Sequence, residues 1–335
     1  MTQVEQFDAL VAHEDAEGGI VLEHEVLDGA ALPDGDVVIA VEYSGVNYKD
    51  ALAVTPKAGV ARSYPLIPGI DVAGTVTASS SSEFAVGDTV VAHGYDIGTG
   101  RHGGYAAVAR YPADHLVKID SLTTAQAAAI GTAGFTAAMS VNAIRAHGVK
   151  PGDGPVLVTG ATGGVGSVSV DLLAGLGYEV VASTGKADAH DLLRDLGAAE
   201  VIDRVPGPEE KVRALGKTHW AAVIDCVGGK TLAYALSTLK YGGIAAISGL
   251  AGSADLPATV HPFILRAVTL AGIDSVLLDI EARRTLWGQI ESELLPLHLD
   301  RITCDVSVLD VPDVLRTIIG GGVTGRTRVD VRNGF

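Results

Sequence analysis

The sequence predicts an α/β protein with two domains, one rich in β-strands and one built on a doubly wound parallel sheet. Its 335 residues exceed the roughly 250–300 at which a single hydrophobic core stops growing. After Val37, short strands alternate with turns rich in Gly and Pro, whereas apolar strands alternate with helical segments from residue 156 to 273. Hydrophobic residues make up 47% of the chain, which is enough to fill two packed cores.

The β-rich domain is expected to contain residues 1–122 and 300–335. Its predicted strands are apolar or β-branched runs bounded by turn residues. The tail, residues 302–331, repeats a strand–helix–strand pattern, and we expect it to fold back onto this domain. The earlier strands are predicted over residues 37–43, 70–77 and 88–93.

The parallel-sheet domain is expected to span residues 123–299. Apolar strands separated by helices are typical of a parallel sheet that is covered on both faces. Helices are predicted from residue 123 or 124 to 130, from 136 to 147 and from 165 to 175. The strands are predicted over residues 156–159, 180–183, 201–203, 221–225, 243–248 and 268–273.

The segment between Asp120 and Arg145 contains no charged side chain. It is rich in Ala, Gly, Thr and Ser and includes Gln126 and Asn142, so its hydrophobicity is low for a membrane span. We therefore expect helices that pack closely inside the protein through small residues, and no membrane partner.

The charge of the chain excludes nucleic acid and anionic membranes as expected partners. Asp and Glu outnumber Lys and Arg by 40 to 24, which gives a formal net charge of −16. Phosphate backbones and anionic headgroups require clustered cations, whereas the longest basic run here is the pair Arg283–Arg284. The two cysteines, Cys226 and Cys304, lack C-x-x-C spacing, so we expect no disulfide framework and a reducing, cytoplasmic location.

The strongest motif is a glycine-rich turn that follows the strand at 156–159 and precedes the helix at 165–175. Glycine allows the backbone to approach a pyrophosphate without an intervening Cβ, and the helix N-terminus offers free N–H groups to the anion. This order of strand, turn and helix predicts a dinucleotide-binding site. Its expected contact residues are Thr162, Gly163, Gly164, Val165 and Gly166.

The residues after the next strand indicate which dinucleotide binds. An Asp or Glu there would accept hydrogen bonds from a ribose 2′-hydroxyl and repel a 2′-phosphate. The chain has Ser183-Thr184-Gly185-Lys186 instead, and Arg204 follows the third strand. Hydroxyl donors and cations suit a phosphate dianion, so we predict NADPH rather than NADH. The alternative is that Lys186 is an ordinary solvated residue at a helix start.

Taken together, these residues resemble the medium-chain dehydrogenase/reductase superfamily, and within it the zinc-independent branch of acrylyl-CoA reductases and quinone-oxidoreductase-like proteins. The resemblance covers nearly the whole chain. The segments that carry the resemblance are residues 44–52, 67–74, 130–137, 160–167, 260–266 and 272–275. The last two of these segments point to the acrylyl-CoA reductases in particular.

The resemblance implies a GroES-like catalytic domain beside the Rossmann cofactor domain. It also implies a homodimer joined through the edge strand at 268–273, and cofactor contacts at Tyr48, Leu250, Ile264 and Ser275.

We expect no catalytic metal. Catalytic zinc needs three protein ligands, and in the zinc-dependent relatives a Cys stands at the place of Asn47 and a His at that of Ile70. The His102-Gly103-Gly104 neighbourhood offers a lone histidine, which is more often structural than a ligand. The reductase branch often has His-Trp where this chain has Arg101-His102, so the shape of the substrate mouth differs here.

Without a metal to polarise a carbonyl, an activated alkene is the easier substrate. Hydride from NADPH would add to the β-carbon, a proton to the α-carbon, and the enolate oxygen would need a hydrogen-bond donor. Tyr48 is the candidate donor and proton relay, Asn47 would orient substrate or nicotinamide, and Asp71 would hold a neighbouring group or a water. Alternatively, Tyr48 only packs over the nicotinamide and Asp71 makes a structural hydrogen bond.

The predicted activity is the reduction of an enoyl-CoA thioester. Candidate cations for coenzyme A are Lys49, Lys57, Arg62 and Arg101, whose convergence the sequence does not reveal. One alternative is an NADPH:quinone or enone oxidoreductase with a smaller cleft. An alternative of another class is an NADPH-binding sensor without turnover, which the retained segments 47–50 and 69–74 disfavour.

Overall fold

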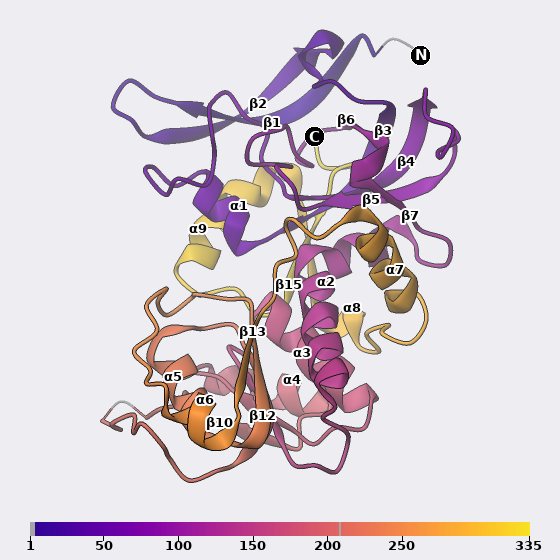
Figure 1. Ribbon diagram of the computed structural model, residues 1–335. Coiled ribbons are helices and arrows are strands. Elements are labelled where there is room, and N and C mark those ends of the chain that lie inside the picture. Colours follow the sequence, from indigo (N-terminus) through magenta and orange to yellow (C-terminus); the bar gives the residue numbers. More distant parts are fainter. Residues whose placement is uncertain (1–3, 208) are drawn as a thin grey trace. The chain divides into compact units, whose positions relative to one another are not determined.

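The computed structural model describes residues 4–207 and 209–335 (Figure 1). The chain divides into two compact units. Unit 1 comprises Met1–Thr132, Ser275–Glu293 and Thr303–Phe335, and unit 2 comprises Ala133–Asp274 and Leu294–Ile302. The fold class is the predicted one, a GroES-like β-rich unit and a Rossmann-type parallel sheet.

Unit 1 is organised around a mostly antiparallel sheet whose strands follow the order β14-β15-β3-β4-β5-β7, with β6 also paired to β3. The tail does fold back, because β15 pairs antiparallel with β3 and parallel with β14. The bounds are β3 Val37–Val46, β4 Asp71–Ser79, β5 Thr89–His93, β6 Val108–Tyr111, β7 Leu116–Lys118, β14 Thr303–Ser307 and β15 Arg326–Asp330.

A separate antiparallel hairpin in unit 1 consists of β1 (Gln6–Glu14) and β2 (Ile20–Asp28). β1 buries Leu10 and Val11 in the core of the unit, whereas β2 is largely exposed. Three helices complete the unit, and α1 packs against α9. They are α1 Tyr48–Ala53, α7 Ile280–Ile290 and α9 Val311–Ile319.

The bounds of unit 1 differ from the expected ones at α7, which had been assigned to the cofactor domain. The reason is that α7 packs on the β-rich sheet. The Arg283 guanidinium lies 2.8 Å from Nδ1 of the buried His93 on β5, and the Trp287 indole N–H donates to Nε2 of the same ring at 2.8 Å.

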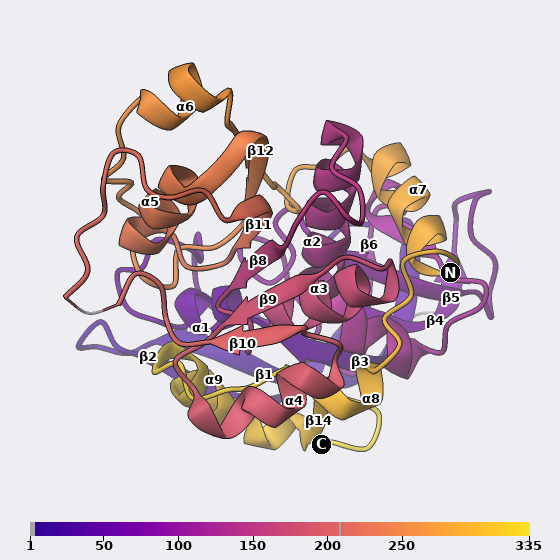
Figure 2. The ribbon, with the colours of Figure 1, turned by 90° about the horizontal axis from the view of Figure 1, so that it is seen from below.

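Unit 2 contains a six-stranded parallel sheet in the order β10-β9-β8-β11-β12-β13 (Figure 2). This is the doubly wound order in which ligands bind outside the carboxyl ends of the central strands. Three of its strands, β8, β9 and β11, are buried along their whole length, as strands covered on both faces are. The strands of the sheet are β8 Val156–Thr159, β9 Val180–Ser183, β10 Glu200–Ile202, β11 Trp220–Asp225, β12 Leu239–Ile247 and β13 Thr269–Gly272.

The helices of unit 2 follow the predicted alternation of strand and helix. Among them, α3 begins directly after the glycine-rich turn and ends one residue before Leu176. Their bounds are α3 Gly164–Gly175, α4 His190–Asp195, α5 Gly229–Thr238, α6 His261–Arg266 and α8 Leu299–Ile302.

Helix α2 (Thr124–His147) begins in unit 1 and continues into unit 2. Gly131 interrupts it with φ 48° and ψ −159°, a backbone conformation that only glycine adopts without strain. The two predicted helices thus form one interrupted helix. α2 is long and apolar enough to cross a membrane, but 78% of its 18-residue apolar stretch is buried inside the protein.

Candidate active site

The glycine-rich turn between β8 and α3 forms a cradle for an anion. The Gly163 N–H donates to the Gly160 carbonyl at 2.9 Å, which closes the turn. A Cβ on Gly166 would lie 2.8 Å from the Ala161 Cα, so this position accepts only glycine. Since the first N–H groups of a helix have no partner within it, those of α3 face the turn as donors for a pyrophosphate.

Hydroxyl groups connect this turn to the end of β9. The Thr162 and Thr184 hydroxyls lie 3.2 Å apart, and Thr184 also accepts from the Lys186 N–H at 3.1 Å. Ser183 donates its hydroxyl to the Asp203 carbonyl at 3.0 Å. The Ser183 hydroxyl is therefore engaged within the protein, whereas the Thr184 hydroxyl lies next to the glycine-rich turn.

Two cations converge at the end of β9. A Cβ on Gly185 would lie 2.7 Å from the Arg204 Cζ, so the guanidinium lies directly over this glycine. Desolvation and the charge of Arg204 lower the pKa of Lys186, while Asp188 opposes this shift. Lys186 and Arg204 are thus close enough to interact, and their shared positive potential suits a phosphate dianion.

Asp225 supports the turn from the end of β11. It is buried, and its carboxylate accepts from the Thr159 hydroxyl at 2.6 Å and from the Gly228 N–H at 2.7 Å. Burial raises the pKa of this carboxyl. Asp225 therefore fastens the carboxyl ends of β8 and β11 to each other, a role the sequence did not single out.

Tyr48 is the first residue of α1, and 38% of it is exposed. Asn47 is the N-cap of this helix. The Asp50 carboxylate accepts from the Asn47 backbone N–H at 2.7 Å, as a capping residue in the third helical position does. The start of α1 is therefore fixed, and the Tyr48 ring is held at the surface of unit 1.

The Asn47 side chain forms hydrogen bonds inside the protein through both its nitrogen and its oxygen. Its Nδ2 donates to Asp71 at 2.7 Å and to Asp50 at 3.3 Å, and its Oδ1 accepts from the Arg326 guanidinium at 3.0 Å. Asn47 is also buried. With both of its N–H donors engaged, this amide holds the start of α1 in the buried network, and its expected part in orienting substrate or nicotinamide stays a prediction.

Asp71 is the centre of the same buried network. One of its oxygens accepts from the Thr132 N–H at 2.8 Å and from the Thr132 hydroxyl at 2.6 Å. The other accepts from Asn47 and lies 3.3 Å from the Arg326 guanidinium. Asp71 thus holds three neighbouring groups and has no free oxygen for a water at the substrate.

Two aspartates share one arginine in this network. Asp50, Asp71 and Arg326 are all buried, so ionising both acids leaves one negative charge without compensation. Burial, and then the charge of Asp71, raise the pKa of Asp50 to about 7. Burial and the two aspartates also raise the pKa of Tyr105.

The remaining predicted cofactor contacts lie in both units. Leu250 and Ile264 belong to unit 2 and are exposed. Ile264 lies within α6. Ser275 is buried in unit 1, where its carbonyl accepts from Arg283 at 3.0 Å.

The predicted coenzyme A cations lie in unit 1. Arg62 and Arg101 do converge, since each has a nitrogen 3.6 Å from one oxygen of the Asp96 carboxylate. Lys57 is exposed on the same loop as Arg62, and Lys49 is half-buried on α1.

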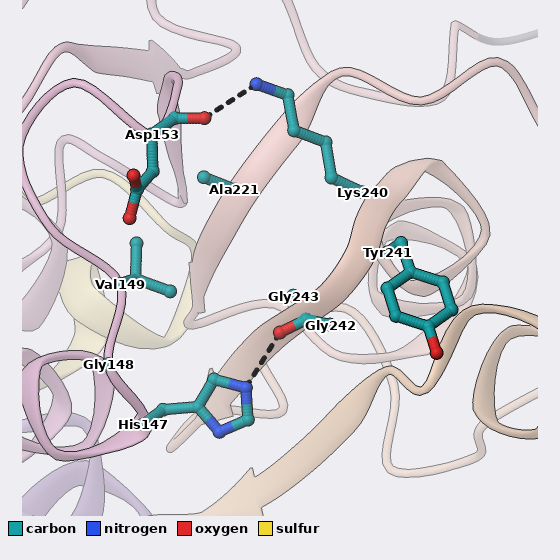
Figure 3. A pocket seen from close by; sticks show the side chains of 9 residues that line it. All are labelled: His147, Gly148, Val149, Asp153, Ala221, Lys240, Tyr241, Gly242 and Gly243. Atoms are coloured by element: carbon teal, nitrogen blue, oxygen red, sulfur yellow. Dashed lines mark hydrogen bonds between the residues drawn. The ribbon is translucent and has the colours of Figure 1, made fainter.

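A small cavity of about 220 Å³ in unit 2 lies away from the glycine-rich turn (Figure 3). Its lining residues include Ala221, Lys240 and Tyr241 near the starts of β11 and β12, whereas the turn follows the end of the parallel strand β8. Two of its polar side chains are engaged, because Lys240 donates to the Asp153 carbonyl and His147 contacts the Gly242 carbonyl, both at 2.8 Å. We assign no ligand to it.

Among the described residues, one group has metal-ligating atoms close together, namely His13, Glu23 and Glu25 on the β1–β2 hairpin. His13 and Glu25 are hydrogen-bonded to each other. Neither Asn47 nor Asp71 belongs to this group.

Two sequence families match the chain. The family described as alcohol dehydrogenase GroES-like domain matches residues 33–121, within unit 1. The family described as zinc-binding dehydrogenase matches residues 164–290, which begin at α3.

Proteins from several bacteria are similar to this chain over nearly its whole length. Acrylyl-CoA reductase AcuI of Ruegeria pomeroyi is 46% identical over 97% of this chain and 99% of its own. The putative quinone oxidoreductase YhfP of Bacillus subtilis is 45% identical over 96% of this chain and 98% of its own, and its crystal structure with NAD bound has a TM-score of 0.93 over 97% and 99% of the two chains. The YhdH oxidoreductase of Salmonella enterica, in complex with NADP, is 42% identical with a TM-score of 0.93 over 96% and 99%.

Proposed function

The chain belongs to the medium-chain dehydrogenase/reductase superfamily, in its zinc-independent branch, and we propose that it is an NADPH-dependent reductase of activated carbon–carbon double bonds that acts on enoyl-CoA thioesters such as acrylyl-CoA. The observation that carries the proposal is how the predicted polar side chains differ in hydrogen bonding and in exposure. The Asn47 and Asp71 side chains are engaged with partners inside unit 1, while Tyr48 is exposed at the start of a fixed helix. A single positioned hydroxyl suits a reaction whose charge develops on one enolate oxygen.

The cofactor is held by unit 2. The N-terminus of α3 and the turn at 162–166 bind the pyrophosphate, while Thr184, Lys186 and Arg204 bind the 2′-phosphate. NADPH supplies the hydride that adds to the β-carbon of the substrate. The absence of a carboxylate directly after β9 supports NADPH over NADH, as does the NADP complex of the Salmonella relative.

Tyr48 stabilises the charge that develops on the substrate and relays the proton. Its hydroxyl donates a hydrogen bond to the enolate oxygen that develops as the β-carbon accepts hydride, and it relays the proton that the α-carbon receives. Asn47 and Asp50 fix the start of α1, so that the backbone that carries Tyr48 is held in place for the reaction.

Reduction of a quinone is the second candidate function. It is supported by the similarity to the putative quinone oxidoreductase YhfP, whose structure contains NAD. The same cofactor site would serve, and a quinone would make no use of the cations Lys57 and Arg62.

The testing experiment measures initial rates of NADPH oxidation with acrylyl-CoA, crotonyl-CoA and a small quinone, with NADH alongside. We expect the highest kcat/KM for acrylyl-CoA with NADPH. Tyr48→Phe should lower kcat about 10²-fold or more and leave the KM for NADPH nearly unchanged. Turnover of quinones alone would replace the thioester by the second candidate, and binding of NADPH without any turnover would support the sensor.

The assembly and location that we propose are a cytoplasmic homodimer. The strand β13 lies at the end of the parallel sheet, so its outer edge is available for pairing with a second copy. The two thiols are free and belong to different units, which supports a reducing compartment.

A further inference from the structure

The loop that follows α1, residues 54–63, carries two exposed cations, Lys57 and Arg62. We propose that this loop is a phosphate site for the coenzyme A part of the substrate, with Arg62 and Lys57 as its cationic donors. The inference rests on the proposed function, and it names the part of the molecule that distinguishes a coenzyme A thioester from a simple enone.

The loop is ordered by contacts at its beginning, its end and within. The Thr55 hydroxyl donates to the Ala51 carbonyl at 2.7 Å, which continues α1 into the loop. The Tyr64 hydroxyl donates to the Ala53 carbonyl at 2.6 Å, which ties the end of the loop back to the helix. The Arg62 N–H donates to the Thr99 carbonyl at 2.8 Å. The two cations are therefore presented on a fixed backbone, which reduces the entropy lost on binding.

Arg62 is placed by a second tight turn, residues 96–100. The Asp96 carbonyl accepts from the N–H groups of Thr99 and Gly100 at 3.1 and 2.8 Å. A Cβ on Gly100 would lie 2.9 Å from the Arg62 Cδ and 3.1 Å from its Nε, so the absence of a side chain at this position makes room for Arg62. Even so, 73% of the Arg62 side chain is exposed.

The charges around Arg62 do not cancel. The Asp96 carboxylate has Arg62 on one oxygen and Arg101 on the other, each at 3.6 Å. One carboxylate neutralises one of the two guanidinium charges, so a positive charge remains. Arg101 also donates to the Asp34 carbonyl at 2.8 Å, which leaves Arg62 as the more exposed of the pair.

The sequence around the loop is positive within a strongly acidic chain. Residues 51–70 contain Lys57 and Arg62 and no Asp or Glu, whereas the whole chain has a formal net charge of −16. Burial, and then the charge of Glu14, raise the pKa of the Tyr64 hydroxyl at the end of the loop. The charged side chains of this stretch are thus both cations, which attract a phosphate.

The loop lies at the correct end of α1 for this role. Tyr48 is at the start of the helix, whose six residues extend about 9 Å, and the loop begins beyond its last residue. Coenzyme A carries its thioester and its phosphates at opposite ends of a long pantetheine arm, so the acyl group at Tyr48 would leave the phosphates beyond α1. NADPH has its own cations, Lys186 and Arg204, in unit 2.

The test compares acrylyl-CoA with the acrylyl thioester of N-acetylcysteamine, which has the same reacting group and no phosphate. For Lys57→Ala and Arg62→Ala we expect the KM for acrylyl-CoA to rise about ten-fold each, with kcat unchanged. The KM for the truncated thioester and for NADPH should stay the same. Lys186→Ala should show the reverse pattern, with a higher KM for NADPH and an unchanged KM for acrylyl-CoA.

Arg316→Ala is the matched control, because Arg316 is an exposed arginine of unit 1 that pairs with Asp313 on α9. It should alter none of these constants. Equal effects of Arg62→Ala on both thioesters, or no effect on either, would overturn the phosphate site. If the unchanged protein reduces the truncated thioester as efficiently as acrylyl-CoA, the phosphate site fails and the proposed function stands, whereas no reduction of either thioester would refute the function itself.

Discussion

At the scale of single residues, the buried Arg326 connects to both Asn47 and Asp71 of the candidate site. Its guanidinium donates to the Ala129 carbonyl at 2.9 Å and to the Asn47 side chain at 3.0 Å, and it lies 3.3 Å from the Asp71 carboxylate. Removing one member of a buried ion pair leaves the other charge without compensation in a medium that solvates it poorly.

We therefore expect Arg326→Met to lower the free energy of unfolding by about 3–5 kcal/mol, measured by urea denaturation. Arg332→Met is the control, since Arg332 forms an exposed ion pair with Glu42 and should cost less than about 1 kcal/mol. The double variant Asp71→Asn, Arg326→Met should recover part of the loss. Equal losses for Arg326→Met and Arg332→Met would contradict the network.

Asp50 predicts a dependence of stability on pH. Its pKa in the folded protein is about 7, above the unperturbed value of 3.8, so folding favours the protonated form. The stability from this group is complete below about pH 4 and is lost as the pH rises through 7. Asp50→Asn stays neutral, so its free energy of unfolding relative to the unchanged protein should increase between about pH 4 and 8, by up to about 4 kcal/mol.

Urea denaturation of both proteins at about pH 5 and about pH 8 checks this. Comparing the two proteins at each pH removes the contribution of every other titrating group. A difference that is the same at both values would show that Asp50 does not titrate in this range.

At the scale of elements, helix α2 depends on one glycine. A Cβ on Gly131 would lie 2.8 Å from an Arg326 guanidinium nitrogen and would overlap the Asp71 carboxylate, and its φ is positive. Gly131→Ala should therefore lower the free energy of unfolding by about 2–4 kcal/mol. Gly288→Ala, in the interior of α7 where a Cβ meets nothing, should instead stabilise by about 0.5–1 kcal/mol. Thermal unfolding of both variants measures the contrast.

The strands β8, β9 and β11 of the parallel sheet were predictable because each is buried along its whole length and is therefore a largely apolar run. The hairpin β1–β2 was not, because most side chains of β2 are exposed and give little apolar periodicity. The bounds of α7 also could not be predicted, since a sequence does not reveal which of two cores a helix joins.

The same distinction applies to the candidate site. The turn at 160–166 is local, so its glycines and the following helix identify it. The partners Asp71 and Arg326 are separated by 255 positions, and no local pattern connects them. The sequence thus identified Asn47 and Asp71, and Asp71 does hold neighbouring groups, but the sequence could not reveal that both residues join a network with Arg326.

At the scale of the whole molecule, the exposed edge of β13 predicts association. Two copies that pair their β13 edges about a two-fold axis would continue the sheet from one subunit into the other. Light scattering should therefore give about twice the chain mass of 34.2 kDa. A mass of a single chain across a range of protein concentrations would contradict this assembly.

The return of residues 326–330 to the first sheet also determines the order in which the protein can be completed during translation. β15 lies between β14 and β3, and it carries the arginine that compensates Asp71. The ribosome makes β3 long before β15, and it makes all of unit 2 in the interval. Because domains tend to fold as they emerge, the unit that is begun first is finished last. Until then the nascent chain has an unpaired strand edge at β3 that chaperones would need to protect.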